Sequence, residues 1–214
     1  MEVLLIRHGD PDYANDTLTE LGHAEARKLA ESIARRPLIS IYVSPLGRAR
    51  DTMRYTADRL KMEAVTHEWL REVGAPAVAG VAGWNLPGSH ILGQSELPAL
   101  DNWFREPLLG VSFFPFYQNI ARGFDAVMMS HGYEKSGHMY RILKSSDDRI
   151  AFFCHYGTIL TLLSYLLHWP LQLVFPHSYI DPTGVTRLRW HETDGQWAVP
   201  RLQVLNDLSH LARV

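Results

Sequence analysis

Two histidines of this 214-residue chain stand at the ends of short apolar stretches. His8 ends "VLLIRH" and His155 ends "AFFCH". Arg7 precedes His8, and Arg48 lies shortly after a third apolar stretch, "ISIYV". Guanidinium groups bind phosphate oxygens through paired hydrogen bonds, and a neutral imidazole is a competent nucleophile near pH 7. We expect these four side chains to form a site for a compact polyanion, and phosphate is the leading candidate.

The elements that must position these residues can be predicted from the apolar pattern. Short, continuous apolar runs are typical of strands that are buried on both faces of a sheet. We predict strands over residues 3–6, 39–44, 149–154, 184–190 and 197–205. Strands that alternate with helices at this spacing favour an α/β fold with a mainly parallel sheet.

Helices are predicted between these strands. Thr19 is a suitable N-cap for a helix over residues 20–35, and Ser44 is a suitable cap for a second helix, with Pro45 in its first turn. The first turn of this second helix carries Arg48. Ligands of open α/β sheets bind outside the carboxyl ends of the strands, so the two arginines and two histidines are expected to converge on one crevice.

Residues 74–140 differ from the rest of the chain. Glycine and proline recur there, the apolar periodicity fades, and aromatic residues gather. We expect helices around 96–106 and 118–135 and interpret the segment as an insertion packed on the main sheet, forming a lid. The segment is too apolar for a disordered linker, so residues 1–214 are expected to form a single domain.

Composition argues against several classes of function. The formal net charge is -2 and the pI about 6.6, so no overall basic surface for nucleic acid is expected. Cys154 is the single cysteine, which excludes a disulfide within the chain. The apolar stretch 158–169 has 12 residues, whereas a membrane span needs about 20. We expect a cytoplasmic protein with no membrane partner.

Four motifs occur in a characteristic order, namely "LLIRHGDP", "SPLGRARDT", "LREV" and "FFCHYGT". Together they resemble the histidine phosphatase superfamily and its phosphatase branch. The resemblance covers nearly the whole chain except residues 74–140. It implies the phosphoglycerate mutase-like fold, a three-layer sandwich with a mainly parallel central sheet flanked by helices.

The resemblance also implies a role for each site residue. The first histidine of the family attacks phosphorus and becomes phosphohistidine, and His8 occupies that position. Arg7 and Arg48 would bind the nonbridging oxygens, His155 would also contact the phosphoryl group, and the backbone N–H of Tyr156 would bind phosphate. Preorganised positive charge suits a phosphoryl transfer in which charge spreads over the equatorial oxygens. Neither a metal ion nor a cofactor is expected.

The leaving oxygen of such a reaction needs a proton. The resemblance assigns the proton donor to Glu72, in "LREV". A raised pKa would keep this carboxyl group protonated at the working pH. Asp10 and Asp12 lie in the loop beside His8 and are the alternative donors.

The chain departs from the family pattern close to the site. Pro11 stands where many members carry serine or threonine, and Tyr156 stands where glycine is common. The stretch "MMSHGYEK" places His131 before a glycine and imitates the second histidine motif. Because the residues before it favour a helix rather than a strand, we do not assign His131 to the site.

The prediction from sequence is hydrolysis of a small phosphorylated metabolite, a phosphomonoester, through phosphohistidine on His8. Two alternatives are a phosphoglycerate mutase-type transfer and a catalytically idle module that binds phosphoryl ligands. The aromatic residues of segment 74–140 suggest an apolar or aromatic group on the substrate, but their packing onto the sheet is the simpler explanation. A homodimer is compatible with the sequence.

Overall fold

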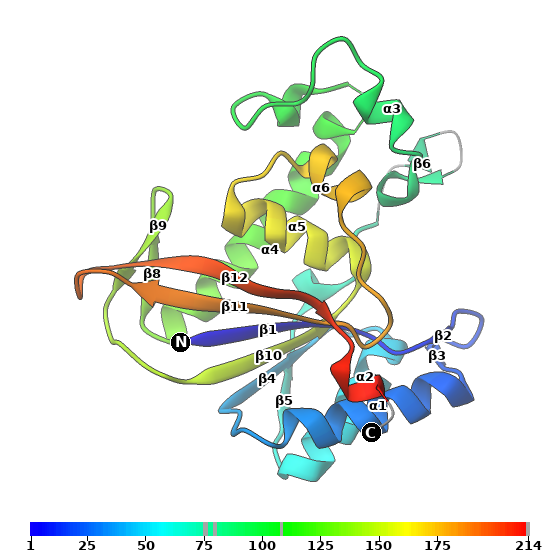
Figure 1. Ribbon diagram of the computed structural model, residues 1–214, viewed down its shortest axis with the longest axis vertical. Coiled ribbons are helices and arrows are strands. Elements are labelled where there is room, and N and C mark those ends of the chain that lie inside the picture. Colours follow the sequence, from blue (N-terminus) through cyan, green and yellow to red (C-terminus); the bar gives the residue numbers. More distant parts are fainter. Residues whose placement is uncertain (75–76, 79–80, 108, 213–214) are drawn as a thin grey trace.

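One sheet of eight strands runs through the computed structural model, which describes residues 1–74, 77–78, 81–107 and 109–212 (Figure 1). The strand order is β5-β4-β10-β1-β11-β12-β9-β8. All five strands predicted from the sequence are present, as β1, β4, β10, β11 and β12. The bounds of the eight strands are Glu2–Arg7 (β1), Ser40–Val43 (β4), Ala64–Thr66 (β5), Tyr133–Ser136 (β8), Met139–Ile142 (β9), Arg149–Cys154 (β10), Val185–Glu192 (β11) and Trp197–Asp207 (β12).

Strand direction divides this sheet into two parts. The neighbours β5, β4, β10 and β1 run parallel to one another. Beyond β1 the pairing is antiparallel, from β11 through β12 and β9 to β8. Because β4, β10 and β1 are parallel neighbours, their carboxyl ends lie at one edge of the sheet, as an α/β fold requires.

Helices cover both faces of the sheet and give the three predicted layers (Figure 1). α1 and α2 pack on one face, and α4 and α5 pack on the other. The bounds of these four helices are Glu20–Ile33 (α1), Gly47–Leu60 (α2), Gly110–Ser130 (α4) and Tyr156–Leu167 (α5).

The position of β1, covered by helices on both faces of the sheet, explains its continuous apolar sequence. Successive side chains of a strand point to opposite faces of the sheet. Leu4 and Ile6 accordingly join the core beneath α1 and α2, whereas Val3 and Leu5 join the core beneath α4 and α5. A strand covered on both faces needs an apolar side chain at every position, which is the pattern seen in this sequence.

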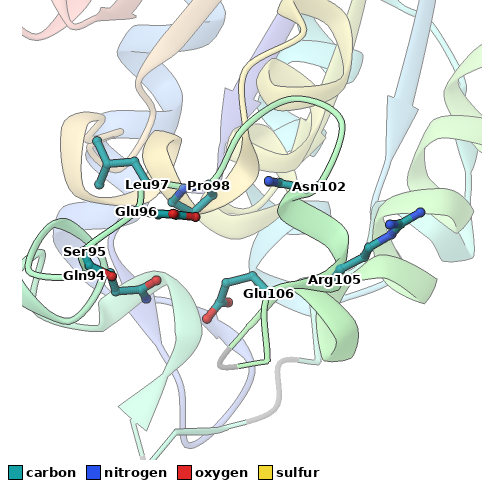
Figure 2. Close-up of a pocket in the computed structure, with 8 residues that line it drawn as sticks. All are labelled: Gln94, Ser95, Glu96, Leu97, Pro98, Asn102, Arg105 and Glu106. Atoms are coloured by element: carbon teal, nitrogen blue, oxygen red, sulfur yellow. The ribbon is translucent and has the colours of Figure 1, made fainter.

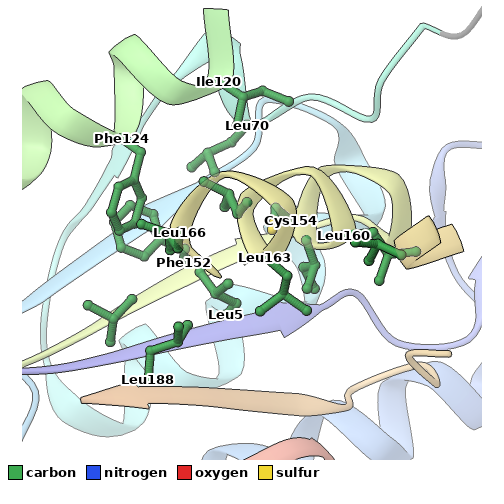
Figure 3. Close-up of a cluster of buried hydrophobic side chains, with 14 of the residues drawn as sticks. Leu5, Leu70, Ile120, Phe124, Phe152, Cys154, Leu160, Leu163, Leu166 and Leu188 are labelled. Atoms are coloured by element: carbon green, nitrogen blue, oxygen red, sulfur yellow. The ribbon is translucent and has the colours of Figure 1, made fainter. Parts of the chain in front are cut away.

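The larger core holds α5 against the sheet (Figure 3). Leu5 of β1 and Phe152 of β10 are fully buried there, together with Leu163 of α5 and Phe124 of α4. The rings of Phe124 and Phe152 have centroids 5.4 Å apart. Full burial of one such side chain contributes about 1.5–3 kcal/mol. This packing fixes the amino end of α5 beside the carboxyl ends of β1 and β10.

The two predicted helix caps have different outcomes. Thr19 is confirmed as the N-cap of α1, since its Oγ1 accepts a hydrogen bond from the Gly22 N–H at 3.1 Å. The cap predicted at Ser44 is wrong, because α2 begins at Gly47 after the N-cap residue Leu46. Ser44 is fully buried and its hydroxyl lies 2.7 Å from Nε2 of His155. The Ser44 side chain therefore contacts His155 and does not cap α2.

Of the two helices predicted in segment 74–140, the one around 96–106 is wrong, and the one around 118–135 is present with different bounds. Between 96 and 106 the structure forms a single 3-10 turn, Trp103–Arg105, instead of a helix. The helix predicted over 118–135 is α4, which begins earlier and ends at Ser130. Gly132 adopts a φ of 90°, which ends the helical path and leads into β8. β8 and β9 are part of the main sheet, so the end of the segment does not belong to a lid. A lid stays a prediction for the residues before β8.

None of the helices in the described ranges has the length and apolar character of a membrane span.

The remaining elements are short. Two small hairpins and several single turns connect the main elements. Their bounds are Pro11–Asp12 (β2), Thr17–Leu18 (β3), Ala77–Val78 (β6), Val81–Ala82 (β7), Ser89–Leu92 (α3), Leu171–His177 (α6), Glu68–Leu70 (η1), Gly83–Asn85 (η2), Trp103–Arg105 (η3) and Ser209–Leu211 (η4).

Two glycines let the loop after β1 pass close to the first turn of α1. A Cβ atom at Gly22 would lie 2.2 Å from the carbonyl oxygen of Asp10, and one at Gly9 would lie 2.8 Å from that of Gly22. The Asp10 N–H also donates to the Glu25 carboxylate at 2.9 Å. The position of His8, at the start of this loop, therefore depends on a close approach between two backbone segments.

We expect Gly22→Ala to lower the free energy of unfolding by about 2 kcal/mol, because the added methyl group forces this loop and α1 apart. Gly74→Ala is the matched control, since a Cβ there meets no atom closer than 3.9 Å. The control should change stability by less than about 0.5 kcal/mol. Urea unfolding measures both values, and equal losses for the two variants would contradict the close approach.

Candidate active site

The structure brings Arg7, His8, Arg48 and His155 together at the carboxyl edge of the parallel strands. Arg7 ends β1, His8 follows it, Arg48 lies in the first turn of α2, and His155 is the N-cap residue of α5 after β10. The two imidazole centroids are 5.2 Å apart. Both guanidinium groups are close enough to lower the pKa of both imidazoles. The convergence expected from the sequence is therefore present.

His8 is held in one protonation state and one tautomer. Its side chain is 1% exposed, and its Nδ1 lies 2.8 Å from the carbonyl oxygen of Gly9. A carbonyl oxygen accepts only, so Nδ1 carries the proton and Nε2 is left unprotonated. Burial, reinforced by the charges of Arg7 and Arg48, lowers the pKa of His8 to about 3. Nε2 is therefore available as a nucleophile at neutral pH.

His155 is fully buried beside His8 and is oriented by Ser44. The Ser44 hydroxyl oxygen accepts from the Leu46 N–H at 3.3 Å and lies 2.7 Å from Nε2 of His155. This arrangement favours donation from the hydroxyl to Nε2, which places the ring proton on Nδ1. Burial, together with the neighbouring charges, lowers the pKa of His155 well below its ordinary value. Ser44 was not assigned to the site from the sequence.

Three buried nitrogens at this edge have no hydrogen-bond partner within the described part of the chain: Nε of Arg7, Nε of Arg48 and Nδ1 of His155. Other nitrogens of the arginines are anchored, since Arg7 donates to the carbonyl oxygen of Ile180 at 2.5 Å and Arg48 donates to Asp16 at 2.7 Å. Buried polar groups in native proteins normally have a partner. These donors suit the oxygens of a bound phosphoryl group.

Two further residues join the loop of His8 to the helix of Arg48, and sequence reasoning missed both. Asp16 accepts from the Arg48 guanidinium and from the Gly47 N–H, each at 2.7 Å. Thr52 accepts from the Gly9 N–H at 2.9 Å and donates to the Arg48 carbonyl oxygen at 2.8 Å. The threonine of "SPLGRARDT" was the one signal that could have indicated such a connection.

Glu72 lies against the amino end of α5. Its carboxylate accepts from the backbone N–H groups of Val73 at 3.0 Å, Thr158 at 3.2 Å and Gly157 at 3.4 Å. Burial raises the pKa of Glu72, while these hydrogen bonds and the charge of Arg48 act in the opposite direction. The net rise keeps the carboxyl group protonated to a higher pH than an ordinary glutamate, as a proton donor requires.

The two alternative donors are bound elsewhere in the loop. The Asp10 carboxylate accepts from the Thr19 hydroxyl at 2.6 Å. Hydrogen bonds from Asn15, through its side chain and its backbone N–H, lower the pKa of Asp12, so this carboxyl group is ionised near neutral pH. The geometry therefore favours Glu72 over Asp12 as the donor.

Tyr156 and His131 occupy different surroundings. The ring of Tyr156 lies against Arg7, with the guanidinium carbon 5.4 Å from the ring centroid, and its hydroxyl donates to the Ser178 carbonyl oxygen at 3.0 Å. His131 follows the carboxyl end of α4, where its Nε2 lies 2.7 Å from the Tyr42 hydroxyl. The structure thus places the Tyr156 ring beside Arg7, whereas phosphate binding by the Tyr156 backbone N–H stays a prediction. His131 follows a helix, as predicted.

Two of the cavities in the described part of the chain bear on the site, one because it is separate from it and one because it borders Glu72. One of about 320 Å³ is formed by residues 94–98 together with Asn102, Arg105 and Glu106 (Figure 2) and is lined by none of the predicted site residues. Another of about 310 Å³ is bordered by Glu72 and by apolar side chains that include Phe116. No group of three or more histidine, cysteine, aspartate or glutamate side chains in the described ranges is arranged to hold a metal ion.

Comparison with known families tests the predicted membership of the histidine phosphatase superfamily. The family model of the histidine phosphatase superfamily (branch 1) matches residues 3–204. The chain therefore belongs to this superfamily, which confirms the predicted family and the predicted enzyme class, histidine phosphatase.

Two solved structures share the fold over nearly the whole chain. Phosphoserine phosphatase from Entamoeba histolytica, in complex with 3-phosphoglyceric acid, is 19% identical with a TM-score of 0.68, and 99% of each chain is covered. Mycobacterial glucosyl-3-phosphoglycerate phosphatase is 21% identical with a TM-score of 0.68, over 96% of this chain and 98% of that chain. The predicted phosphoglycerate mutase-like fold is confirmed.

A curated relative matches over a shorter region. The 2,3-bisphosphoglycerate-dependent phosphoglycerate mutase of Thermoplasma acidophilum is 32% identical in an alignment 87 residues long, and the match covers 36% of this chain. The match spans 44% of that mutase's length, so this chain matches less than half of its curated relative.

The lowered pKa of His8 should make stability depend on pH. The ordinary pKa is 6.5, and the folded protein lowers it to about 3. Between these values the unfolded chain binds a proton at His8 that the folded protein does not, so the free energy of unfolding falls as the pH falls. The loss from His8 alone, between its ordinary pKa and about pH 4, is on the order of 3 kcal/mol.

Urea unfolding at a series of pH values measures this dependence. We expect His8→Gln to flatten the slope below the ordinary histidine pKa, because the variant has no imidazole to protonate at this position. His90→Gln is the control, since His90 is exposed in α3. A His8→Gln protein with the same pH slope as the unchanged protein would contradict the burial argument.

Proposed function

We propose that the protein is a metal-independent phosphatase that hydrolyses a small phosphomonoester through phosphohistidine on His8. The observation that carries this proposal is the unprotonated Nε2 of His8, held beside two guanidinium groups whose buried Nε atoms have no partner within the described residues. A nucleophile and donors for the phosphoryl oxygens are thus in place before substrate binds. Such preorganised donors cost no reorganisation at the moment of reaction.

The proposed reaction has two steps. In the first, a bond forms between Nε2 of His8 and phosphorus while the bond from phosphorus to the ester oxygen breaks, and that oxygen takes the proton of Glu72. In the second, ionised Glu72 accepts a proton from water as the water oxygen attacks phosphorus. The nitrogen–phosphorus bond then breaks, its electron pair returns to Nε2, and phosphate leaves.

The surroundings of Glu72 suit both of its proposed states. Burial raises its pKa and so favours the protonated form that begins the first step. The backbone N–H groups of Val73, Gly157 and Thr158 then stabilise the carboxylate that the first step produces. Arg7, Arg48 and the Nδ1 proton of His155 would bind the phosphoryl oxygens during both steps.

Phosphoglycerate mutase-type transfer is the second candidate function, because the curated relative in Thermoplasma acidophilum is named as a mutase. A mutase needs further cationic groups for the substrate carboxylate and must keep water away from phosphohistidine. Assaying the interconversion of 2- and 3-phosphoglycerate beside phosphate release distinguishes the two functions. A cytoplasmic location, a homodimer and a small-molecule phosphate ester as the partner stay predictions.

We expect His8→Ala to lower kcat/KM for 4-nitrophenyl phosphate at least about 1,000-fold, because the covalent route is lost. Acid-labile, base-stable phosphate should be trapped on the unchanged protein and absent from the variant. The exposed His90 supplies the control variant His90→Ala, which should keep full activity. Activity untouched by His8→Ala would disprove the mechanism, and activity lost on treatment with a chelator would disprove metal independence.

The role of Glu72 can be separated from its contact with α5 by the choice of leaving group. Nitrophenolate leaves without a proton, whereas an alkoxide needs one. We expect Glu72→Gln to lower kcat/KM for benzyl phosphate about 100- to 10,000-fold and to cost at least tenfold less with 4-nitrophenyl phosphate. Hydrolysis of the benzyl ester should also fall as the pH rises through the raised pKa of Glu72. Equal losses with both esters would make Glu72 a structural cap.

A further inference from the structure

Two tyrosines beside the phosphate-binding arginines expose most of their side chains. Tyr13 is 67% exposed and Tyr179 is 63% exposed. A single exposed aromatic residue is ordinary, but two that are connected to the two arginines of one candidate site form a surface suited to a ligand. Figure 1 shows the segments that carry them, the β2–β3 hairpin and the connection from α6 to β11, near the carboxyl end of β1.

Tyr13 lies at the tip of the β2–β3 hairpin and is held on Arg48. The guanidinium carbon of Arg48 is 5.5 Å from the centroid of the Tyr13 ring. Asp12 accepts two backbone N–H groups of the turn at 3.1 and 3.2 Å. Asp16, at the end of the turn, binds both the Arg48 side chain and the Gly47 N–H. The hairpin tip is therefore anchored to a residue that would bind phosphate.

Tyr179 is connected to the other arginine indirectly, through Tyr156 and through the backbone on both sides of it. The residues on both sides of it are held, since the Ser178 carbonyl oxygen accepts from the Tyr156 hydroxyl at 3.0 Å and the Ile180 carbonyl oxygen accepts from Arg7 at 2.5 Å. The rings of Tyr156 and Tyr179 have centroids 5.7 Å apart. Tyr156 itself lies on Arg7. A row of guanidinium, buried ring and exposed ring thus leads outward from the site.

Packing explains most aromatic residues of segment 74–140, whereas Phe116 is 36% exposed and borders the cavity beside Glu72. Trp103 packs against Tyr117 with ring centroids 4.8 Å apart, and Phe104 packs against Phe114 at 5.1 Å. Trp103 is 3% exposed. These rings are covered by one another and by the core, as the simpler explanation predicted, whereas Tyr13 and Tyr179 present open rings to solvent.

We propose that the site takes phosphate esters of alcohols that carry a flat aromatic ring, and that Tyr13 and Tyr179 bind this ring while Arg7 and Arg48 bind the phosphate. The inference rests on the proposed function and names its substrate class. Aromatic rings attract one another at centroid separations of about 4.5–7 Å. The Tyr13 ring lies beside Arg48, and the Tyr179 ring lies beside Tyr156, which lies on Arg7. An aromatic ring that a short ester arm joins to the bound phosphate can therefore reach these tyrosines.

Two chemically matched esters test the inference. Benzyl phosphate and cyclohexylmethyl phosphate release similarly basic alcohols of similar size, but only the benzyl ring is flat. We expect kcat/KM to be about tenfold higher for the benzyl ester, the upper range for aromatic pairing. Equal values, or a preference for glycerol 3-phosphate over both esters, would overturn the inference and leave the proposed function intact.

Variants of the two tyrosines assign the preference to them. Tyr13→Ser and Tyr179→Ser should each lower the benzyl-to-cyclohexylmethyl ratio about threefold, and the double variant about tenfold. Tyr13→Phe and Tyr179→Phe keep the ring and should keep the ratio. The cyclohexylmethyl ester is the internal reference in each variant, so the ratio of the two esters isolates the contact with the flat ring from any general loss of activity. A ratio that survives in the double serine variant would contradict the role of these residues.

Binding measurements separate this inference from the proposed function. The dissociation constants of benzylphosphonate and cyclohexylmethylphosphonate, which cannot be hydrolysed, are measured by calorimetry on the same proteins. Tighter binding of the benzyl compound that weakens in the double serine variant supports the aromatic site even if no ester is hydrolysed. Equal binding of the two phosphonates by an active enzyme overturns the aromatic site alone.

Discussion

The site depends on the burial of two imidazoles beside two guanidinium groups. His8 and His155 are almost completely removed from solvent, and Arg7 and Arg48 add positive charge close to both rings. Desolvation and like charge both disfavour the imidazolium form, so both rings stay neutral at pH values where an exposed histidine is partly charged. The fold thereby holds an unprotonated imidazole nitrogen beside two guanidinium groups.

The packing of the rest of the structure holds these buried side chains in place. Parallel pairing of β4, β10 and β1 places three chain segments at one edge, and the buried face of α5 holds its amino end there. The close approach of Gly9 to Gly22 and the bridge through Thr52 fix the loop after His8. These contacts hold the loop that begins at the buried His8 in place.

Much of this arrangement could be predicted from the sequence, because strands buried on both faces have continuous apolar runs and the candidate site residues follow these runs, directly or in the first turn of the next helix. Arg7, His8, Arg48 and His155 follow from that pattern. Ser44, Asp16 and Thr52 could not be found in this way, since a short polar residue is equally common in caps and turns and only tertiary contact shows its partner. The helix predicted at 96–106 is wrong, since only the turn Trp103–Arg105 forms there, and Trp103 packs against Phe104 and against Phe114 of α4, contacts that only the tertiary structure shows.

The neutral, fixed tautomer of His8 is the central claim, and nitrogen NMR of protein labelled with ¹⁵N-histidine tests it most directly. The His8 resonances, assigned by their loss in His8→Gln, should show a protonated Nδ1 and an unprotonated Nε2 with no titration between about pH 7.5 and pH 4.5. An imidazole that instead titrates near the ordinary histidine pKa, or that carries its neutral proton on Nε2, would contradict the account.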